Sequence, residues 1–472
     1  MRRLLLLLLS ATLSCAPSVT APRRPNIVFV LVDDLRWDDF AIAGHPFVET
    51  PNIDRLANEG ARFLNAFAST PLCSPSRASI LTGQYVRTNS IIDNTARDSA
   101  SHRLQTFAIP LEAAGYRTAF LGKWHMGNDD TRRPGWTRWV AMKGQGEAVD
   151  PKLNIDGERR TVPGYVTDVL TNFADEFVRE RSDKPFLLFL AHKALHPNVQ
   201  QRDDGSTGAL GGQPEGFVPA PRHRGRYASA VVPRRENALR APVKKPALNR
   251  AIPGLPPLSP KTGTSDTDIR GRLEMLLGVD ESLGRLVATL TELGQLDNTV
   301  IVLTGDHGYF YGEHGLDQER RLAYEETARI PLIIRYPKVA RAGSTPAQMA
   351  QTIDFASTIL ALAGVSDTVR RQGVSLVPVL DGSATDWRHS VFLEYYTDQV
   401  FPRTLTMGYD AVRTERYKYI VYRELPRMEE LYDLQTDPYE MDNLIGTGRG
   451  AALLPEVRAE LERLKREALP PR

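Results

Sequence analysis

Short runs of apolar and β-branched residues recur along this chain, and each leads into polar residues that can carry chemistry. The predicted strands span 27–32, 116–121, 185–191 and 299–303, and they lead into Asp33-Asp34, Gly122-Lys123-Trp124-His125, His192-Lys193-Ala194-Leu195-His196 and Thr304-Gly305-Asp306-His307. Continuous apolar runs are typical of parallel strands that are buried on both faces. Because such sheets bind ligands at the carboxyl ends of their strands, the layout predicts an α/β fold with a site at that edge.

The stretch Cys73-Ser74-Pro75-Ser76-Arg77 is the second informative feature. The chain has two cysteines, and the other, Cys15, lies in a leader-like segment, so Cys73 has no partner for a structural disulfide. Pro75 suits the first turn of a helix and Gly83 suits its end, which places Cys73 at a helix N-terminus, where anions are favoured. A buried free thiol is the alternative. With Arg77 one turn further on, the stretch predicts an anionic ester as substrate.

The N-terminus has the layout of an export signal. Arg2-Arg3 is followed by the apolar run 4–9, which is too short to span a bilayer. We predict a signal peptide over 1–21, and Thr12-Leu13-Ser14-Cys15 resembles a bacterial lipobox in which Cys15 would be lipidated. The protein is therefore expected to be exported, periplasmic or at the cell surface. The net charge of +2 argues against nucleic acid as a partner of the whole chain.

Helical patterns separate the predicted strands. Thr50-Pro51 predicts a capped helix that runs to about Phe63, and 266–293 is a long amphipathic helix. The adjacent carboxylates of Asp33 and Asp34 repel each other unless a cation or protons intervene, although a solvated turn is also compatible with the pair. Asp306 alone is equally compatible with a local Asx turn.

Taken together, these motifs resemble those of the type I sulfatases. The resemblance rests on the 73–77 motif followed by Leu81-Thr82-Gly83, on Gly122-Lys123-Trp124-His125, and on Asp306-His307 after a strand. It implies an alkaline-phosphatase-like α/β/α sandwich with a smaller C-terminal α+β subdomain. The expected divisions are a catalytic domain over 24–380 and a subdomain over 385–472.

The resemblance also implies a site and a mechanism. A formylglycine-generating enzyme would convert Cys73 into formylglycine, whose hydrated form attacks sulfur, and Arg77 would orient it. His196 would protonate the leaving alcohol, and His125 would take a proton when sulfate is expelled. The expected metal is calcium, with magnesium as the alternative. Its implied ligands are Asp33, Asp34, Cys73, Asp306 and His307, and Lys123, Lys193 and Arg320 are expected to contact the sulfate. Arg320 stands where many members have a lysine.

The segment 198–263 shows no periodicity and is rich in basic residues, with eleven Lys or Arg against four acids. It is compatible with a solvated surface excursion or with a basic rim that attracts sulfated polyanions. Within it, 219–223 and 225–227 resemble bacterial N-acetylglucosamine-6-sulfatase-like members, which implies a sulfated carbohydrate such as 6-sulfated N-acetylglucosamine. The alternatives are a phosphatase or phosphonate monoester hydrolase on the same fold, and a non-catalytic binder of sulfated glycans.

Overall fold

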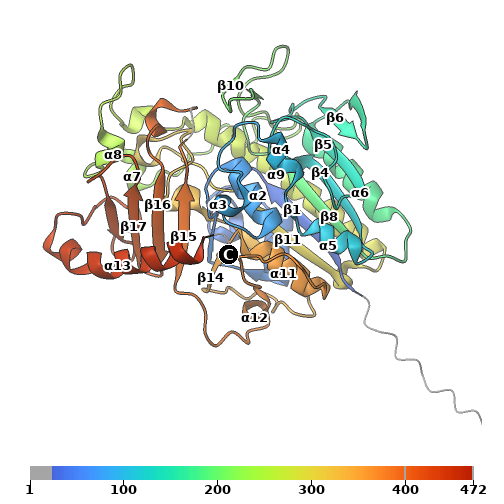
Figure 1. Cartoon of the computed structure of the whole chain (residues 1–472). Coiled ribbons are helices and arrows are strands. Elements are labelled where there is room, and N and C mark those ends of the chain that lie inside the picture. Colours follow the sequence, from blue (N-terminus) through green and yellow to red (C-terminus); the bar gives the residue numbers. More distant parts are fainter. Residues whose placement is uncertain (1–23, 398–399, 470–472) are drawn as a thin grey trace, which may run out of the picture.

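A nine-stranded mixed sheet forms the centre of the protein in a computed structural model that describes residues 24–397 and 400–469 (Figure 1). The predicted signal peptide and Cys15 lie outside the described residues. The strand order is β2-β13-β11-β1-β8-β4-β5-β6-β7. The five inner strands are parallel, and they are β11 (Thr299–Gly305), β1 (Asn26–Val32), β8 (Phe186–His192), β4 (Arg117–Lys123) and β5 (Arg138–Met142). The outer strands are antiparallel, namely β13 (Leu332–Arg335), β2 (Ala61–Arg62), β6 (Lys152–Ile155) and β7 (Glu158–Thr161).

Helices cover both faces of this sheet. Alternate residues of β1 enter two separate cores, with Val28, Val30 and Val32 in one and Ile27, Phe29 and Leu31 in the other. The first core is covered by α1 (Pro51–Glu59), α6 (Val166–Arg179) and α9 (Asp266–Glu292), and the second by α2 (Cys73–Thr82), α5 (Ala108–Ala113) and α11 (Asp354–Ala363). The predicted α/β/α sandwich is therefore confirmed, including the long helix near 266–293.

A second, four-stranded antiparallel sheet lies beside the sandwich (Figure 1). It is built from β15 (Ser390–Tyr395), β16 (Tyr409–Thr414), β17 (Tyr417–Tyr422) and β18 (Glu430–Asp433). The final helix, α13 (Gly448–Glu467), packs Val457 and Leu461 against one face of it. The other face shares a core with residues of the sandwich such as Phe310 and Tyr324.

The predicted helix from Pro51 to about Phe63 was too long. Helix α1 ends at Glu59 because Gly60 passes so close to β13 that a Cβ there would lie 2.6 Å from the Ile334 carbonyl oxygen. Thr50 does not cap the helix with its side chain, because its hydroxyl contacts Asp54 Oδ1 at 3.2 Å instead.

Most of the remaining elements are short. They are η1 (Ala41–Ala43), β3 (Asn65–Phe67), α3 (Val86–Asn89), α4 (Asp98–His102), β9 (Gln200–Gln201), β10 (Thr207–Gly208), α7 (Glu236–Leu239), α8 (Pro246–Asn249), η2 (Pro260–Thr262), η3 (Leu296–Asn298), η4 (Glu313–Gly315), α10 (Glu325–Ala328), β12 (Arg329–Ile330), β14 (Met349–Gln351), α12 (Val377–Leu380) and η5 (Pro402–Thr404). Within the described ranges, no helix is long and apolar enough to cross a membrane.

Candidate active site

Four neighbouring strands end at the same edge of the central sheet, and their ends carry the predicted polar residues. The strands β11, β1, β8 and β4 lie side by side, with Val32 in register with both Gly305 and His192. Asp33 and Asp34 follow β1, Lys193 and His196 follow β8, and Asp306 follows β11, while Lys123 is the last residue of β4. The structure therefore brings together residues that are far apart in the sequence.

Helix α2 delivers Cys73 to this edge. The helix begins at Cys73, contains Pro75 in its first turn, and ends at Gly83, which has a left-handed φ of 66°. Cys73 is completely buried, and its Sγ lies 3.2 Å from His307 Nε2. Cys73 is thus a buried free thiol, but it lies at a helix N-terminus beside an imidazole and not in an apolar core.

Arg77 connects three of the strand ends. Its Nε donates to Asp306 Oδ2 at 2.9 Å, its Nη1 donates to the Lys123 carbonyl oxygen at 2.5 Å, and its Nη2 lies 3.6 Å from Asp33 Oδ2. The Lys123 ammonium forms an ion pair with Asp33. Burial alone would raise the pKa of Asp33, but Lys123 and Arg77 hold it well below its usual value. The Asp33 carboxylate is therefore charged at neutral pH.

The carboxylates at the strand ends fit a hard divalent cation. One ligand atom from each of Asp33, Cys73, Asp306 and His307 can be chosen so that all lie within 4.8 Å of one another. Asp33 Oδ1 and both carboxylate oxygens of Asp34 are buried without a hydrogen-bond donor. Orphaned carboxylate oxygens of this kind are what a calcium or magnesium ion binds. Despite burial, Asp306 and Cys73 raise the pKa of His307 to about 9 in the absence of a cation.

Arg320 lies in the site, as predicted. Its Nε is 2.8 Å from Asp34 Oδ1, but the N–H is not aimed at the oxygen, so the contact is an ion pair without a hydrogen bond. Its Nη2 donates to His196 Nε2 at 2.7 Å, while His196 Nδ1 donates to the Pro197 carbonyl oxygen at 2.8 Å. Burial and Lys123 hold the pKa of His196 well below its usual value, so this imidazole is neutral.

Lys193 and His192 have different surroundings. Lys193 is buried and donates to the Pro197 carbonyl oxygen at 3.0 Å, and burial together with Lys123 lowers its pKa to about 7. His192 is buried and its Nε2 lies 3.3 Å from Ser282 Oγ of helix α9, which indicates a structural role.

His125 is held by two glutamines that sequence analysis missed. Gln201 Nε2 donates to the Asn94 carbonyl oxygen at 2.6 Å, which turns Gln201 Oε1 toward His125 Nε2, and the two atoms form a short hydrogen bond. Gln145 Nε2 donates to the same Oε1 at 2.7 Å. Gln145 Nε2 also lies 2.9 Å from His125 Nε2, but Gln201 Oε1 can only accept, so its short contact favours the tautomer with the proton on Nε2. The Nδ1 atom is buried without a hydrogen-bond partner. Burial and Lys123 keep the pKa of His125 well below its usual value.

Asp93 and Asn94 lie in the loop between α3 and α4 and make different contacts. Asp93 Oδ1 accepts from the Thr95 backbone N–H at 3.0 Å and Asp93 binds Arg97, so it stabilises the local turn. Asn94 Oδ1 accepts from the Ser74 backbone N–H at 3.1 Å, at the first turn of α2. Asn94 thus helps to fix the start of the helix that carries Cys73.

The ion pairs of the basic segment 198–263 favour the solvated surface excursion over the basic rim. Most of the basic residues between 198 and 263 form ion pairs with acids, several of which belong to other elements. The paired residues are Arg222, Arg226, Arg234, Arg235, Arg240, Lys244 and Lys245. The excess positive charge of this segment is therefore largely neutralised within the fold.

Comparisons with known proteins agree with this geometry. A family model described as sulfatase matches residues 25–365, and one described as the C-terminal part of N-sulphoglucosamine sulphohydrolase matches 312–467. The fold is the alkaline-phosphatase-like sandwich of sulfatase structures, and the protein is a sulfuric ester hydrolase. The chain belongs to the sulfatase family.

Two named relatives and one solved structure are similar to this chain over most of its length. The chain is 32% identical to an N-acetylglucosamine-6-O-sulfatase of Bacteroides thetaiotaomicron, over 96% of this chain and 88% of that protein. It is 29% identical to the Homo sapiens N-acetylglucosamine-6-sulfatase, over 94% and 85%. A structure of a protein in complex with its substrate D-glucosamine-2-N,6-O-disulfate matches with a TM-score of 0.81 and 32% identity, over 94% of this chain and 98% of that one.

Proposed function

We propose that this sulfatase removes the 6-O-sulfate from glucosamine residues of glycosaminoglycan-type glycans. The substrate class is supported by the names of the two relatives and by the sulfated glucosamine bound in the similar structure. The observation that carries the catalytic part is the position of Cys73, which lies at the start of α2 between His307 and the strand ends that bear three aspartates.

Cys73 is the proposed source of the nucleophile. A formylglycine-generating enzyme would modify it, and the hydrated formylglycine would supply the hydroxyl that attacks sulfur. A divalent cation, calcium or alternatively magnesium, would be held by Asp33, Asp34, Asp306, His307 and residue 73, and when bound it supplies positive charge next to the sulfate oxygens. Lys123 and Arg320 would add further positive charge around the same oxygens.

The two histidines have complementary proposed roles. His125 Nδ1 is buried without a partner, and with its Nε2 proton on Gln201 Oε1 this atom would accept the proton when sulfate is expelled. His196 Nε2 accepts from Arg320 in this structure. If Arg320 turned toward the sulfate, His196 Nε2 would be released to serve the leaving alcohol oxygen. Lys193, buried behind the same strand ends, is the second candidate for a sulfate contact.

Mass spectrometry of the tryptic peptide Phe63–Arg77 tests the nucleophile. We expect formylglycine at position 73 in protein from its native host, together with sulfate release from N-acetylglucosamine-6-sulfate. The Cys73→Ala variant should fold and release no sulfate. Unmodified cysteine in active protein would overturn the mechanism. Faster turnover of a phosphate ester or phosphonate would indicate the phosphatase alternative, and binding of sulfated glycans without turnover would indicate a non-catalytic binder.

We also propose that the protein is exported and anchored by lipid at Cys15. The support is the sequence of the leader alone, because residues 1–23 lie outside the described part. Detergent partitioning of whole-cell extracts tests it. The wild-type protein should enter the detergent phase and Cys15→Ala should not, and equal partitioning of the two would contradict the anchor.

A further inference from the structure

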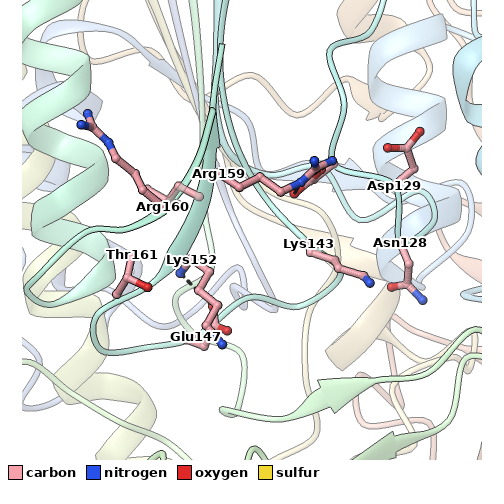
Figure 2. Close-up of a pocket in the computed structure, with 10 residues that line it drawn as sticks. Asn128, Asp129, Lys143, Glu147, Lys152, Arg159, Arg160 and Thr161 are labelled. Atoms are coloured by element: carbon pink, nitrogen blue, oxygen red, sulfur yellow. Dashed lines mark hydrogen bonds and ion pairs between the residues drawn. The ribbon is translucent and has the colours of Figure 1, made fainter. Parts of the chain in front are cut away.

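A polar cavity of about 720 Å³ lies next to the catalytic strand ends, and none of the proposed catalytic residues line it (Figure 2). Its walls come from the loop after β4, the loop after β5, and the β6–β7 hairpin at the sheet edge. The lining residues are Asn128, Asp129, Asp130, Lys143, Glu147, Lys152, Leu153, Arg159, Arg160 and Thr161. The volume is that of a small-molecule or monosaccharide site.

Strand pairing places this cavity at the same edge of the sheet as the catalytic residues. Lys123, the last residue of β4, is in register with Met142, the last residue of β5, and Lys143 follows directly. A smaller cavity of about 140 Å³ shares Asn128, Lys143 and Glu147 with the larger one and is also lined by Gln145 and Gln201. Since both glutamines contact His125, the smaller cavity lies between the larger cavity and the residues that hold His125.

The charges in the cavity favour an acidic ligand. Two of the three lining acids have arginine partners, with Asp130 bound to Arg159 at 2.5 Å and Asp129 lying 3.9 Å from Arg133 Nη1. The third, Glu147, accepts from the Lys152 backbone N–H at 3.1 Å.

Two lysines of the cavity remain free to meet a ligand. In the described part of the chain, neither the Lys143 nor the Lys152 ammonium forms an ion pair, and both residues are exposed. Figure 2 shows the Lys143 ammonium extending toward Asn128, whereas Arg160 points to the opposite side. Two lysines are thus available for an anionic group, beside amide, carboxylate and hydroxyl groups that can bind sugar hydroxyls.

We propose that this cavity is a subsite for a second, acidic sugar of the glycan whose sulfated glucosamine occupies the catalytic site. Lys143 and Lys152 bind the carboxylate or sulfate of that sugar, and Asn128 and Thr161 bind its hydroxyls. The proposal rests on the proposed function. It assigns recognition of the polymer to the β5–β7 edge of the sheet, so the enzyme prefers an oligosaccharide over a monosaccharide.

The test compares three substrates that share a terminal 6-sulfated glucosamine. They are the monosaccharide, a tetrasaccharide with uronate carboxylates, and the same tetrasaccharide after reduction of its carboxyl groups. Two further tetrasaccharides, with and without a sulfate on the neighbouring sugar, distinguish the two sources of negative charge. We expect the wild type to prefer the carboxylated or sulfated tetrasaccharide, and Lys143→Ala and Lys152→Ala each to reduce kcat/KM on it by about fivefold.

The monosaccharide is the internal control, and its kcat/KM should not change in these variants. Lys184→Ala removes the same charge just before β8, at the amino-terminal ends of the parallel strands. It should leave kcat/KM unchanged on every substrate. Equal losses on the monosaccharide and the tetrasaccharides, or a wild type that does not distinguish them, would overturn the subsite. A wild type that releases no sulfate even from the monosaccharide would instead overturn the proposed function.

Discussion

Gly122 is the residue whose replacement most directly tests how the sheet positions the catalytic groups. It precedes Lys123 in β4, has a φ of +115°, and packs against β8 so closely that a Cβ would lie 2.0 Å from the Ala191 carbonyl oxygen. Carbon and oxygen atoms in contact prefer separations of about 3.5 Å. In Gly122→Ala the two strands must therefore separate locally by at least about 1 Å, and the end of β4 moves with them.

This displacement should reduce both activity and stability. The moved segment carries the Lys123 ammonium that pairs with Asp33, the Lys123 carbonyl oxygen that accepts from Arg77, and His125. A misplacement of about 1 Å typically costs about 100-fold in rate. The left-handed φ costs a non-glycine residue about 1–2 kcal/mol, and overpacking adds about 1–3 kcal/mol. We expect kcat to fall about 100-fold and the free energy of unfolding to fall by about 2–5 kcal/mol.

Gly115→Ala is the matched control, because Gly115 has a φ of +91° and no atom within 4 Å of the position of a Cβ. It should show the cost of the left-handed φ alone, about 1–2 kcal/mol, with kcat unchanged. The assay combines sulfate release from N-acetylglucosamine-6-sulfate with thermal unfolding of both variants. If Gly122→Ala kept the wild-type kcat, or lost no more stability than Gly115→Ala, the reasoning would be refuted.

Three further predictions concern individual groups. Gln201→Leu removes the acceptor that fixes the His125 tautomer, so kcat should fall about 10- to 100-fold with little change in KM; an unchanged kcat would contradict the assignment of the tautomer. Chelation by EDTA should abolish activity and lower Tm, and added calcium at 100 times its Kd should restore about 3 kcal/mol of unfolding free energy. Asp306→Ala should show no such response. A wild-type Tm that changes with neither addition would exclude the cation site. Burial raises the pKa of Glu440 from 4.5 to about 7 despite Lys418, so the native protein holds a proton that the unfolded chain releases. Wild type should therefore lose on the order of 3 kcal/mol of stability as pH rises from about 4.5 to about 7. Glu440→Gln should not show this loss in urea unfolding, and identical pH dependence of the two proteins would be evidence against it.

Much of the fold and of the strand-end site could be predicted from sequence because the information is local. A buried strand such as 27–32 is recognisable from its own residues, and the position of Asp33 at its end follows directly. The same reasoning placed Lys123 and Asp306 at one edge, and the structure shows that edge assembled as expected. The division of the chain into domains at about residue 380 remains a prediction.

The features that could not be predicted depend on contacts between segments that are distant in the sequence. Gln201 lies in a segment without periodicity, and only the folded hairpin of β9 and β10 brings it to His125. The two interpretations of the basic segment could not be separated from sequence, because a count of charges does not reveal partners. Arg222, for example, binds Asp168 of α6 and Glu281 of α9. Helix α1 ends early for a similar reason, since the close approach of Gly60 to β13 is visible only in three dimensions.

The complete burial of Cys73 determines when, relative to folding, the residue can be modified. In the folded chain no modifying enzyme can reach its sulfur, which is covered by His307 and the end of β11. Strand β11 begins at Thr299, long after Cys73 has been synthesised, and pairing between strands so distant in sequence is slow. Conversion to formylglycine would have to finish in that interval. The time that the sheet takes to form thus limits the time available for the modification. A variant that formed its sheet sooner would contain more unconverted cysteine.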